Sequence, residues 1–174
     1  DGLLDLAVAD QGTNEIEVYL GDGKGSFGEP RSVSTGKKPL ALLAGDFDKN
    51  QTQDLISADS ASNQISFFRG KGNGKFKKGK TFAVGGSPIA IYAEDFNHDG
   101  KLDVLSVNKR SRDASILFGG GKKIFKAEKR IKIGNRPIDS ALSDINNDGN
   151  LDLLILSQER IHIFESTSKG FFHR

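Results

Sequence analysis

Cysteine, methionine and tryptophan are absent from the 174 residues, and only two tyrosines and four prolines are present. Without cysteine the chain forms no disulfide, no thiolate metal site and no cysteine nucleophile. There is no apolar run of the roughly 18 residues needed to cross a bilayer, and no charged-then-apolar leader. Because the sequence has no Met and begins with Asp1, we expect it to be a processed or excised piece of a longer polypeptide.

Histidine is scarce as well, which bears on catalysis. His98, His162 and His173 are the only histidines, and none stands in a recognisable local signature with a nucleophile or a carboxylate. His98 is expected to point outward into solvent. His162 alternates with Ile161 and Ile163, so we expect it to face away from whatever those residues bury. No glycine motif of a nucleotide-binding loop follows a strand and opens a helix. The sequence therefore predicts a protein that is not an enzyme.

What the chain does contain is one repeat of about 49 residues. A fixed period of this length decides the architecture before local propensities do. The same interval separates corresponding aspartates, glycines, prolines and phenylalanines, among them Asp46, Asp95 and Asp144; Asp5, Asp54, Asp103 and Asp152; Gly36, Gly85 and Gly134; Pro39, Pro88 and Pro137. We interpret 1–174 as a single segment with repeats at about 1–38, 39–87, 88–136 and 137–174, of which the first and last are partial.

Within each repeat, short apolar runs alternate with Gly-rich turns, which predicts four antiparallel strands. The first strand should follow the Gly/Pro turn, and the second is apolar nearly throughout, as in a strand covered on both faces. Four strands per 40 to 50 residues are typical of a propeller blade. A β-helix would have a shorter period, and a sandwich would not repeat its turns at one interval. The predicted fold is thus all-β, a β-propeller segment of about four four-stranded antiparallel blades within a larger ring, for which we expect seven blades.

An acidic loop separates the first and second strands of each full repeat: DFDKNQTQD (46–54), DFNHDGKLD (95–103) and DINNDGNLD (144–152). Oxygen-bearing residues occupy positions 1, 3, 5 and 9, and alternate side chains of a tight loop converge on one point. Hard oxygen ligands of mixed carboxylate and amide type suit Ca²⁺ better than Mg²⁺, and no His or thiolate is placed to favour zinc. The predicted calcium ligands, with position 7 acting through its backbone carbonyl, are Asp46, Asp48, Asn50, Thr52 and Asp54; Asp95, Asn97, Asp99, Lys101 and Asp103; Asp144, Asn146, Asp148, Asn150 and Asp152.

Position 6 of the loop requires a sharp turn. Gly100 and Gly149 occupy it in two loops, whereas Gln51 occupies it in the other, so we expect the 46–54 site to be the weakest or the most strained. The loops begin like an EF-hand loop but lack its glutamate at position 12 and lie between strands. The alternative is that they are polar Asx turns without a metal. Three carboxylates within nine residues repel one another strongly unless a cation lies among them, which favours calcium.

These features resemble the FG-GAP, or VCBS, repeat family, whose blades are similar to the propeller of integrin α subunits and of many bacterial surface proteins. The resemblance rests on the loop DxNxDGxxD, on the strand that follows it (LDVLSVN, LDLLILS), on the hairpin ending GGG or GDGKGSF, and on the Gly/Pro turn. It spans essentially the whole chain. It implies calcium at 95–103 and 144–152, and at 46–54 the departure is Gln51.

Charge is unevenly distributed along the chain. Eleven of the 23 acidic residues belong to the acidic loops, Asp1 and Asp5 included, which leaves 12 acids elsewhere, against 25 Lys and Arg in the whole chain. The basic excess falls in the expected outer strands, and its members are Lys75, Lys77, Lys78, Lys80, Lys122, Lys123, Lys126, Lys129, Arg130 and Lys132. Lysine on an edge strand prevents edge-to-edge aggregation. The alternative is a surface for polyanions, with nucleic acid the least favoured because no aromatic stacking platform is evident.

Two classes of function remain open. The first is a calcium-stabilised module for binding, adhesion or scaffolding in a secreted or cell-surface protein, located outside the cell, on its surface or in the periplasm, with a protein or polysaccharide ligand. The second is the propeller of a carbohydrate-active enzyme, a polysaccharide lyase or hydrolase, or a lectin-like domain. Against catalysis, the acids outside the loops are scattered singly: Asp10, Asp59, Glu94, Asp113 and Asp139. We also expect an open arc of blades, because the sequence begins midway through an acidic loop, with Asp1 in the place of Asn50, and stops as an outer strand begins, with Phe172 in the place of Phe27. This arc should pack against further blades or self-associate.

Overall fold

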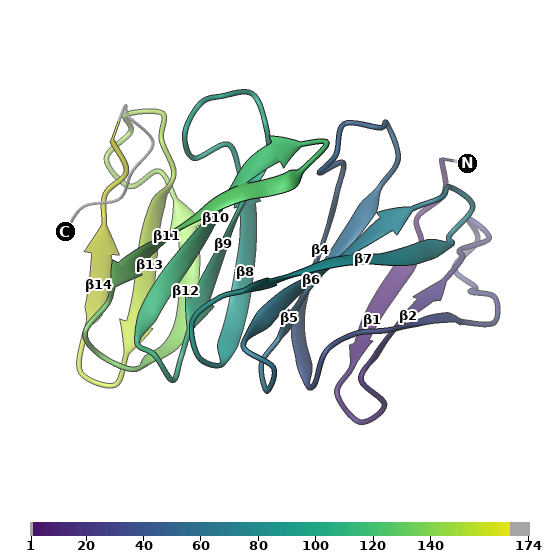
Figure 1. Ribbon diagram of the computed structural model, residues 1–174, viewed down its shortest axis with the longest axis horizontal. Coiled ribbons are helices and arrows are strands. Elements are labelled where there is room, and N and C mark those ends of the chain that lie inside the picture. Colours follow the sequence, from purple (N-terminus) through teal and green to yellow (C-terminus); the bar gives the residue numbers. More distant parts are fainter. Residues whose placement is uncertain (1, 168–174) are drawn as a thin grey trace.

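The computed structural model describes residues 2–167, and all fourteen of its regular elements are β-strands. They form four antiparallel sheets that follow one another along the chain (Figure 1). The first sheet contains β1 (Leu6–Asp10), β2 (Glu15–Tyr19) and β3 (Arg31–Ser34). The second contains β4 (Pro39–Gly45), β5 (Asp54–Asp59), β6 (Gln64–Gly70) and β7 (Phe76–Ala83). The third contains β8 (Pro88–Glu94), β9 (Asp103–Asn108), β10 (Asp113–Gly121) and β11 (Ile124–Lys132), and the fourth β12 (Pro137–Ser143), β13 (Asp152–Ser157) and β14 (Ile161–Phe164).

Each sheet is a meander in which consecutive strands pair, and the first strands of neighbouring sheets, β4, β8 and β12, contact one another. The sheets stand side by side as blades, with the first sheet and the fourth sheet at opposite sides of the row (Figure 1). The prediction of an all-β propeller segment is confirmed, and the four described sheets close no ring. Our expectations for Asp1 and Phe172 concern residues outside the described range. Within that range no helix is long and apolar enough to span a membrane.

The strand pattern follows from the repeated sequence signals. Pro39, Pro88 and Pro137 each begin the first strand of a sheet, directly after the Gly/Pro turn. The second strands β5 and β9 are buried at every residue, as their continuous apolar character predicts. The corresponding strand β13 is partly exposed, because one face of the fourth sheet has no neighbouring sheet among the described residues.

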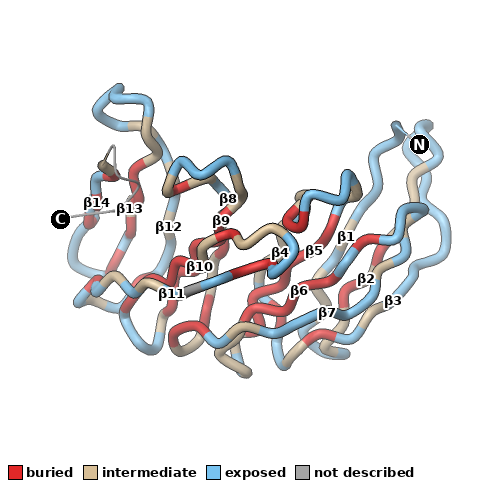
Figure 2. The backbone as a smooth tube through the Cα atoms, turned by 45° about the horizontal axis from the view of Figure 1, so that its top comes forward, coloured by how far each residue is buried: buried red, intermediate tan, exposed pale blue. Residues whose placement is uncertain are grey.

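Three hydrophobic clusters fill the spaces between successive sheets. The first joins Ile16 and Val18 to Leu55 and Phe68. The second lies between the second and third sheets and contains Phe67 and Phe125, and the third lies between the third and fourth. Figure 2 shows buried residues concentrated in the middle of the row and exposed ones at its two ends. Each sheet is therefore held mainly by its neighbours.

The two end faces of the row are apolar and exposed. Leu6 and Val8 are 44% and 37% exposed on the first sheet, and Ile161 and Ile163 are 61% and 44% exposed on the last. Our expectation for His162 is therefore wrong, since its side chain is buried and stacks on Phe164 with ring centroids 6.4 Å apart. The cause is that β14 turns its His162 face toward the third sheet, so the isoleucines face the side without a neighbour.

Polar side chains are buried at the end of the second, third and fourth sheets opposite the acidic loops. Asp59 is fully buried and accepts hydrogen bonds from Ser57 Oγ at 2.7 Å, Ser66 Oγ at 2.6 Å, Gln64 Nε2 at 3.1 Å and the Gly36 amide at 3.0 Å. A Cβ atom at Gly36 would lie 2.4 Å from the same carboxylate. The repeated glycine thus lets the connection from β3 to β4 approach the second sheet closely.

Candidate metal centre

The three acidic loops connect the first and second strands of the second, third and fourth sheets, and all lie along the same side of the row, at the upper ends of the strands in Figure 1. They share a backbone conformation in which positions 4 and 6 have positive φ. These positions are Lys49 (60°), His98 (56°) and Asn147 (60°), and Gln51 (67°), Gly100 (77°) and Gly149 (85°). Gln51 adopts the left-handed conformation that glycine adopts freely, so this loop carries the backbone strain that the sequence indicated.

The aspartate at position 1 organises each loop by accepting two backbone amides. Asp46 accepts from Asn50 N at 2.9 Å and Gln51 N at 2.8 Å. Asp95 accepts from Asp99 N at 2.9 Å and Gly100 N at 2.6 Å, and Asp144 accepts from Asp148 N at 3.1 Å and Gly149 N at 2.9 Å. These are Asx-type bonds, and they fix the turn with the remaining oxygens directed around it.

The aspartate at position 9 is fully buried in all three loops and joins the loop to the hairpin beside it. One oxygen of Asp54 accepts from Gly70 N at 2.8 Å, one of Asp103 from Gly119 N at 2.6 Å, and one of Asp152 from Ser166 N at 2.8 Å. Asp5 makes the same bond to Gly21 N at 3.0 Å. The bond explains the glycines repeated at 21, 70 and 119, where an added Cβ would lie 2.0 to 2.5 Å from a backbone carbonyl oxygen.

The buried carboxyl of Asp103 is poorly compensated. Its Oδ2 atom has no hydrogen-bond partner, whereas Asp54 and Asp152 each receive a second bond at 3.2 Å from the amide of position 2. The Phe96 amide favours the charged form of Asp103 but falls short of hydrogen-bond geometry. The pKa of Asp103 is raised from 3.8 to about 6, mainly by burial and to a smaller extent by the charges of Asp95 and Asp99.

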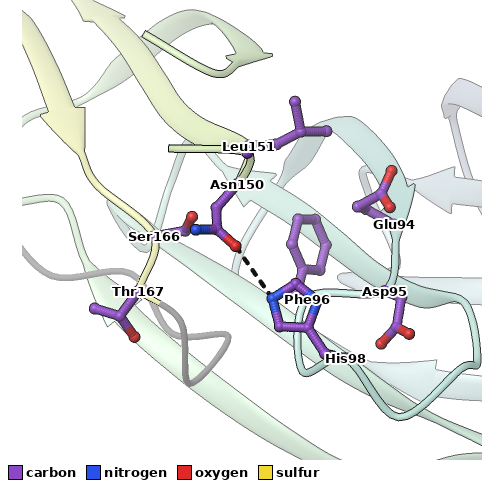
Figure 3. A pocket seen from close by; sticks show the side chains of 9 residues that line it. Glu94, Asp95, Phe96, His98, Asn150, Leu151, Ser166 and Thr167 are labelled. Atoms are coloured by element: carbon purple, nitrogen blue, oxygen red, sulfur yellow. Dashed lines mark hydrogen bonds between the residues drawn. The ribbon is translucent and has the colours of Figure 1, made fainter. Parts of the chain in front are cut away.

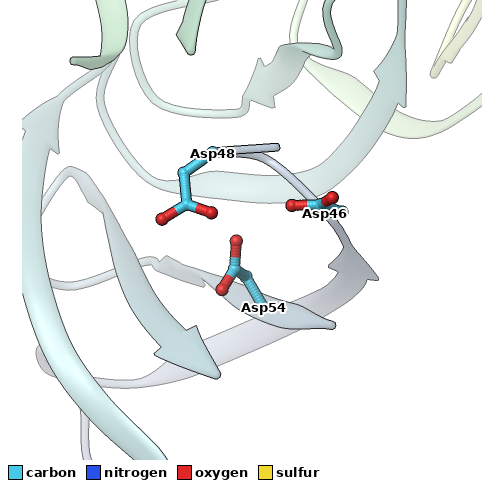
Figure 4. A group of neighbouring side chains, drawn as sticks. All are labelled: Asp46, Asp48 and Asp54. Carbon is cyan, nitrogen blue, oxygen red and sulfur yellow. The ribbon is translucent and has the colours of Figure 1, made fainter. Parts of the chain in front are cut away.

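The loop at 46–54 brings three carboxylates closest together. One oxygen each from Asp46, Asp48 and Asp54 lie within 4.8 Å of one another, and Figure 4 shows the three side chains turned toward a common space. Burial raises the pKa of Asp54, and the charges of Asp48 and Asp46 add to this effect. The Asp48 side chain is only 4% exposed, and its Oδ1 atom has no hydrogen-bond partner. Its Oδ2 atom lies 2.7 Å from Arg69 Nη2, a contact that the sequence did not reveal.

In the other two loops the position-5 carboxylate is held by local donors. The Lys101 ammonium lies 2.7 Å from Asp99 Oδ2 and holds the pKa of that carboxyl below its usual range. Asp148 Oδ1 accepts from the Asn150 amide at 2.8 Å and from its side chain at 2.9 Å, which lowers its pKa in the same way. Both carboxylates are thus held by donors from within their own loops.

The three loops also contact each other in series. Lys49 Nζ donates to the Gly100 carbonyl at 2.5 Å, and His98 Nε2 lies 3.2 Å from Asn150 Oδ1. Figure 3 shows the latter pair across a small hollow of about 60 Å³ between the second and third loops. His98 is exposed, as expected, but its ring bridges two loops rather than standing free in solvent.

The donor set fits a hard divalent cation. Every predicted side-chain ligand in the three loops is a carboxylate or amide oxygen, and Asp48 and Asp103 each contribute a buried carboxylate oxygen without a partner. A buried anionic oxygen is costly unless a positive charge or a donor compensates it. Oxygen ligands of this kind, with backbone carbonyls available at position 7, suit Ca²⁺.

Comparison with known proteins places the fold. An FG-GAP-like repeat model matches residues 1–57 and again 46–106. No curated protein sequence matches the chain significantly.

Solved structures resemble the chain at low sequence identity. The periplasmic gluconolactonase PpgL of Pseudomonas aeruginosa superimposes with a TM-score of 0.73 at 17% identity, covering 98% of this chain and 49% of PpgL. A lectin from Agrocybe aegerita that recognises non-reducing terminal N-acetylglucosamine gives 0.62 at 17% identity, with 92% and 45% covered. BBS1N, in complex with ARL6DN, gives 0.67 at 14% identity, with 100% and 52% covered. The chain thus spans about half the length of the structures it matches, and at such identities they show the fold alone.

The matches cover residues 1–106, more than half of the chain, and the sheets have the arrangement that the repeat predicts. The chain therefore belongs to the FG-GAP-like repeat family and folds as a segment of a β-propeller.

Proposed function

We propose that the chain is a calcium-stabilised propeller module that serves binding, adhesion or scaffolding in a secreted, cell-surface or periplasmic protein. The observation that carries the proposal is the pair of buried carboxylate oxygens, Asp48 Oδ1 and Asp103 Oδ2, that have no partner inside loops rich in oxygen donors. Burial and the charges of Asp95 and Asp99 disfavour the charged form of Asp103. A bound cation would turn this cost into a stabilising interaction.

The residues that would hold calcium are the five of each loop named above. Bound calcium supplies positive charge and no redox or acid–base chemistry. The position-1 aspartates fix the turn, and the position-9 aspartates connect the loop to the neighbouring hairpin. The role of the loops is therefore to tie each first strand to the rest of its sheet.

The acids outside the loops support binding rather than catalysis. Asp59 is buried beneath four donors, and Asp113 Oδ1 accepts from Asn108 Nδ2 at 2.9 Å and Ser111 Oγ at 2.6 Å. Such saturated carboxyls are poorly placed to exchange protons with a substrate. The competing candidate, a glycan-binding or carbohydrate-active propeller, draws support from the two neighbours whose names indicate a lectin and a gluconolactonase.

Thermal unfolding tests the proposal. Calcium at about 100 times its dissociation constant stabilises by about 2.7 kcal/mol per site, so the melting temperature should fall clearly on addition of a chelator. The fall should shrink in Asp103→Ala and stay unchanged in the exposed control Asp139→Ala. Identical melting curves with calcium and with chelator would reject the calcium assignment.

A further inference from the structure

A cationic groove lies between the second and third sheets, near the loop at 46–54. It is formed by β6 and β7 on one side and by the turn of the β10–β11 hairpin on the other, and its volume is about 300 Å³. The buried side chains Phe67 and Ile124 form its floor, and Arg69, Lys77, Lys80 and Lys122 stand exposed around it. No acidic residue lines the groove.

The cations of the groove are placed at a cost to the fold. Arg69 lies directly opposite Lys77 in the antiparallel pair of β6 and β7. Like charges in this position destabilise a sheet. Protection of the β7 edge alone requires lysine on that edge but does not require an arginine facing it on the inner strand. The Asp48 carboxylate, 2.7 Å from Arg69 Nη2, offsets part of this repulsion, and an anion bound between Arg69 and Lys77 would remove the rest.

Lys78 has a different role from its neighbours. Its ammonium donates to the Thr35 carbonyl at 3.0 Å and so joins the second sheet to the end of the first. It belongs to the packing of the sheets, and the groove's binding charge therefore comes from Arg69, Lys77, Lys80 and Lys122.

Arg69 connects the groove to the candidate calcium loop. Its Nη2 atom lies 2.7 Å from Asp48 Oδ2, while Asp48 Oδ1 stays buried and unpaired. A calcium ion held by Asp48 would share this carboxylate with the guanidinium, and the two cations would repel each other. An anion in the groove that draws or neutralises the guanidinium weakens this repulsion.

We propose that this groove binds an anionic polysaccharide, and that its occupancy and calcium binding at 46–54 strengthen each other through Arg69. The coupling half of the proposal rests on the calcium function above, whereas the groove itself does not. A row of separate cations along an open groove matches a chain with regularly spaced carboxylate or sulfate groups. Bases of a nucleic acid would need an exposed aromatic face for stacking, and Phe67 is only 2% exposed. Thermodynamic linkage requires the two effects to be equal: calcium must raise the affinity for polysaccharide by the same factor as polysaccharide raises the affinity for calcium.

Titration of the intact chain with dextran sulfate and with hyaluronate, in calcium and in chelator, tests both halves. Neutral dextran serves as the blank. The triple variant Lys77→Ser, Lys80→Ser, Lys122→Ser should bind at least about tenfold more weakly, and its salt dependence should fall by about one in slope per lysine removed. The matched control Lys24→Ser, Lys37→Ser, Lys132→Ser removes the same charge from exposed positions outside the groove and should stay within about twofold of the parent. Equal losses in the two triple variants would overturn the groove, as would tighter binding of single-stranded oligothymidylate than of dextran sulfate.

Arg69→Gln isolates the coupling. Calcium should raise the polysaccharide affinity of the parent at least about threefold, and the variant should bind polysaccharide equally in calcium and chelator while holding calcium more tightly in the absence of polysaccharide. If calcium shifts the melting temperature of the parent but leaves its polysaccharide affinity unchanged, the coupling is wrong. If calcium shifts no melting temperature, the calcium function fails and the coupling with it, and the groove is judged from the chelator titrations of the two triple variants.

Discussion

At pH 7.5, replacing Asp103 by asparagine should leave the calcium-free protein as stable as the parent or more stable, and should destabilise the protein in calcium. The Asp103 carboxyl is fully buried, one of its oxygens has no partner, and burial raises its pKa from 3.8 to about 6. A pKa raised in the folded state gives stability that is fully present below pH 3.8 and is lost as the pH rises through about 6. At pH 7.5 the free energy of unfolding of the calcium-free protein is therefore about 3 kcal/mol lower, through this group, than it is with the carboxyl protonated.

Asparagine can still accept the amide of Gly119 but carries no charge. In chelator at pH 7.5 its introduction recovers about 3 kcal/mol, against which a buried amide group without a partner costs about 1–3 kcal/mol. The variant should thus be equal to the parent or up to about 2 kcal/mol more stable. In calcium at about 100 times the dissociation constant, the parent gains about 2.7 kcal/mol at this site and the variant does not.

Urea unfolding at pH 4 and pH 7.5, each with calcium and with chelator, measures these four differences. Asp139→Asn, an exposed aspartate outside the loops, serves as the control and should show no dependence on calcium. A loss of stability in Asp103→Asn that is the same in all four conditions would refute the argument, because it would mean that the carboxylate acts only as a hydrogen-bond acceptor.

Three further outcomes follow from the packing. Gly70→Ala should lower the free energy of unfolding in urea by about 2–3 kcal/mol, because the added Cβ would lie 2.0 Å from a backbone carbonyl oxygen. The control Gly25→Ala, at a positive φ but in open space, should lower it by only about 1 kcal/mol. Equal losses in the two variants would contradict the steric argument. Asp59→Ala should lose about 3 kcal/mol or more, since it leaves four donors without their acceptor, and near-neutral unfolding would show that water replaces the carboxylate. The chain should self-associate with rising concentration in light scattering, and Ile161→Ser with Ile163→Ser should reduce this association; a monodisperse monomer at high concentration would contradict it.

The sequence predicted those parts of the fold that local patterns determine. Strand positions follow from apolar runs between Gly-rich turns, and the positive φ of Gly100 and Gly149 follows from the required turn. The burial of β5 and β9 follows from their continuous apolar composition. These features depend on neighbouring residues in the chain, and a repeat states each of them several times.

Contacts between residues that lie far apart in the chain could not be read from the sequence in this way. The ion pair of Arg69 with Asp48 joins the end of one strand to a loop before another, and the exposed face of β14 depends on which neighbouring sheet is present. The glycine at position 70 carried a signal, because its fixed distance of 16 residues from Asp54 recurs between Asp103 and Gly119. That interval marks a hydrogen bond, but only the pairing of the strands identifies the donor and the acceptor.

The fourth repeat reaches the same bond with a shorter chain. Asp152 accepts a hydrogen bond from the amide of Ser166, which lies 14 positions later, whereas the corresponding distance in the other repeats is 16. The difference falls within the β13–β14 hairpin. There Ile155 pairs with His162, whereas the corresponding residue of the third repeat, Ser106, pairs with Ser115. The turn at 158–160 can therefore change length while the acidic loop at the other end of the sheet keeps its attachment. For protein engineering this makes 158–160 a practical insertion point for an epitope or a reporter peptide. In the evolution of the repeat it marks a turn whose length could change without disturbing the acidic loops.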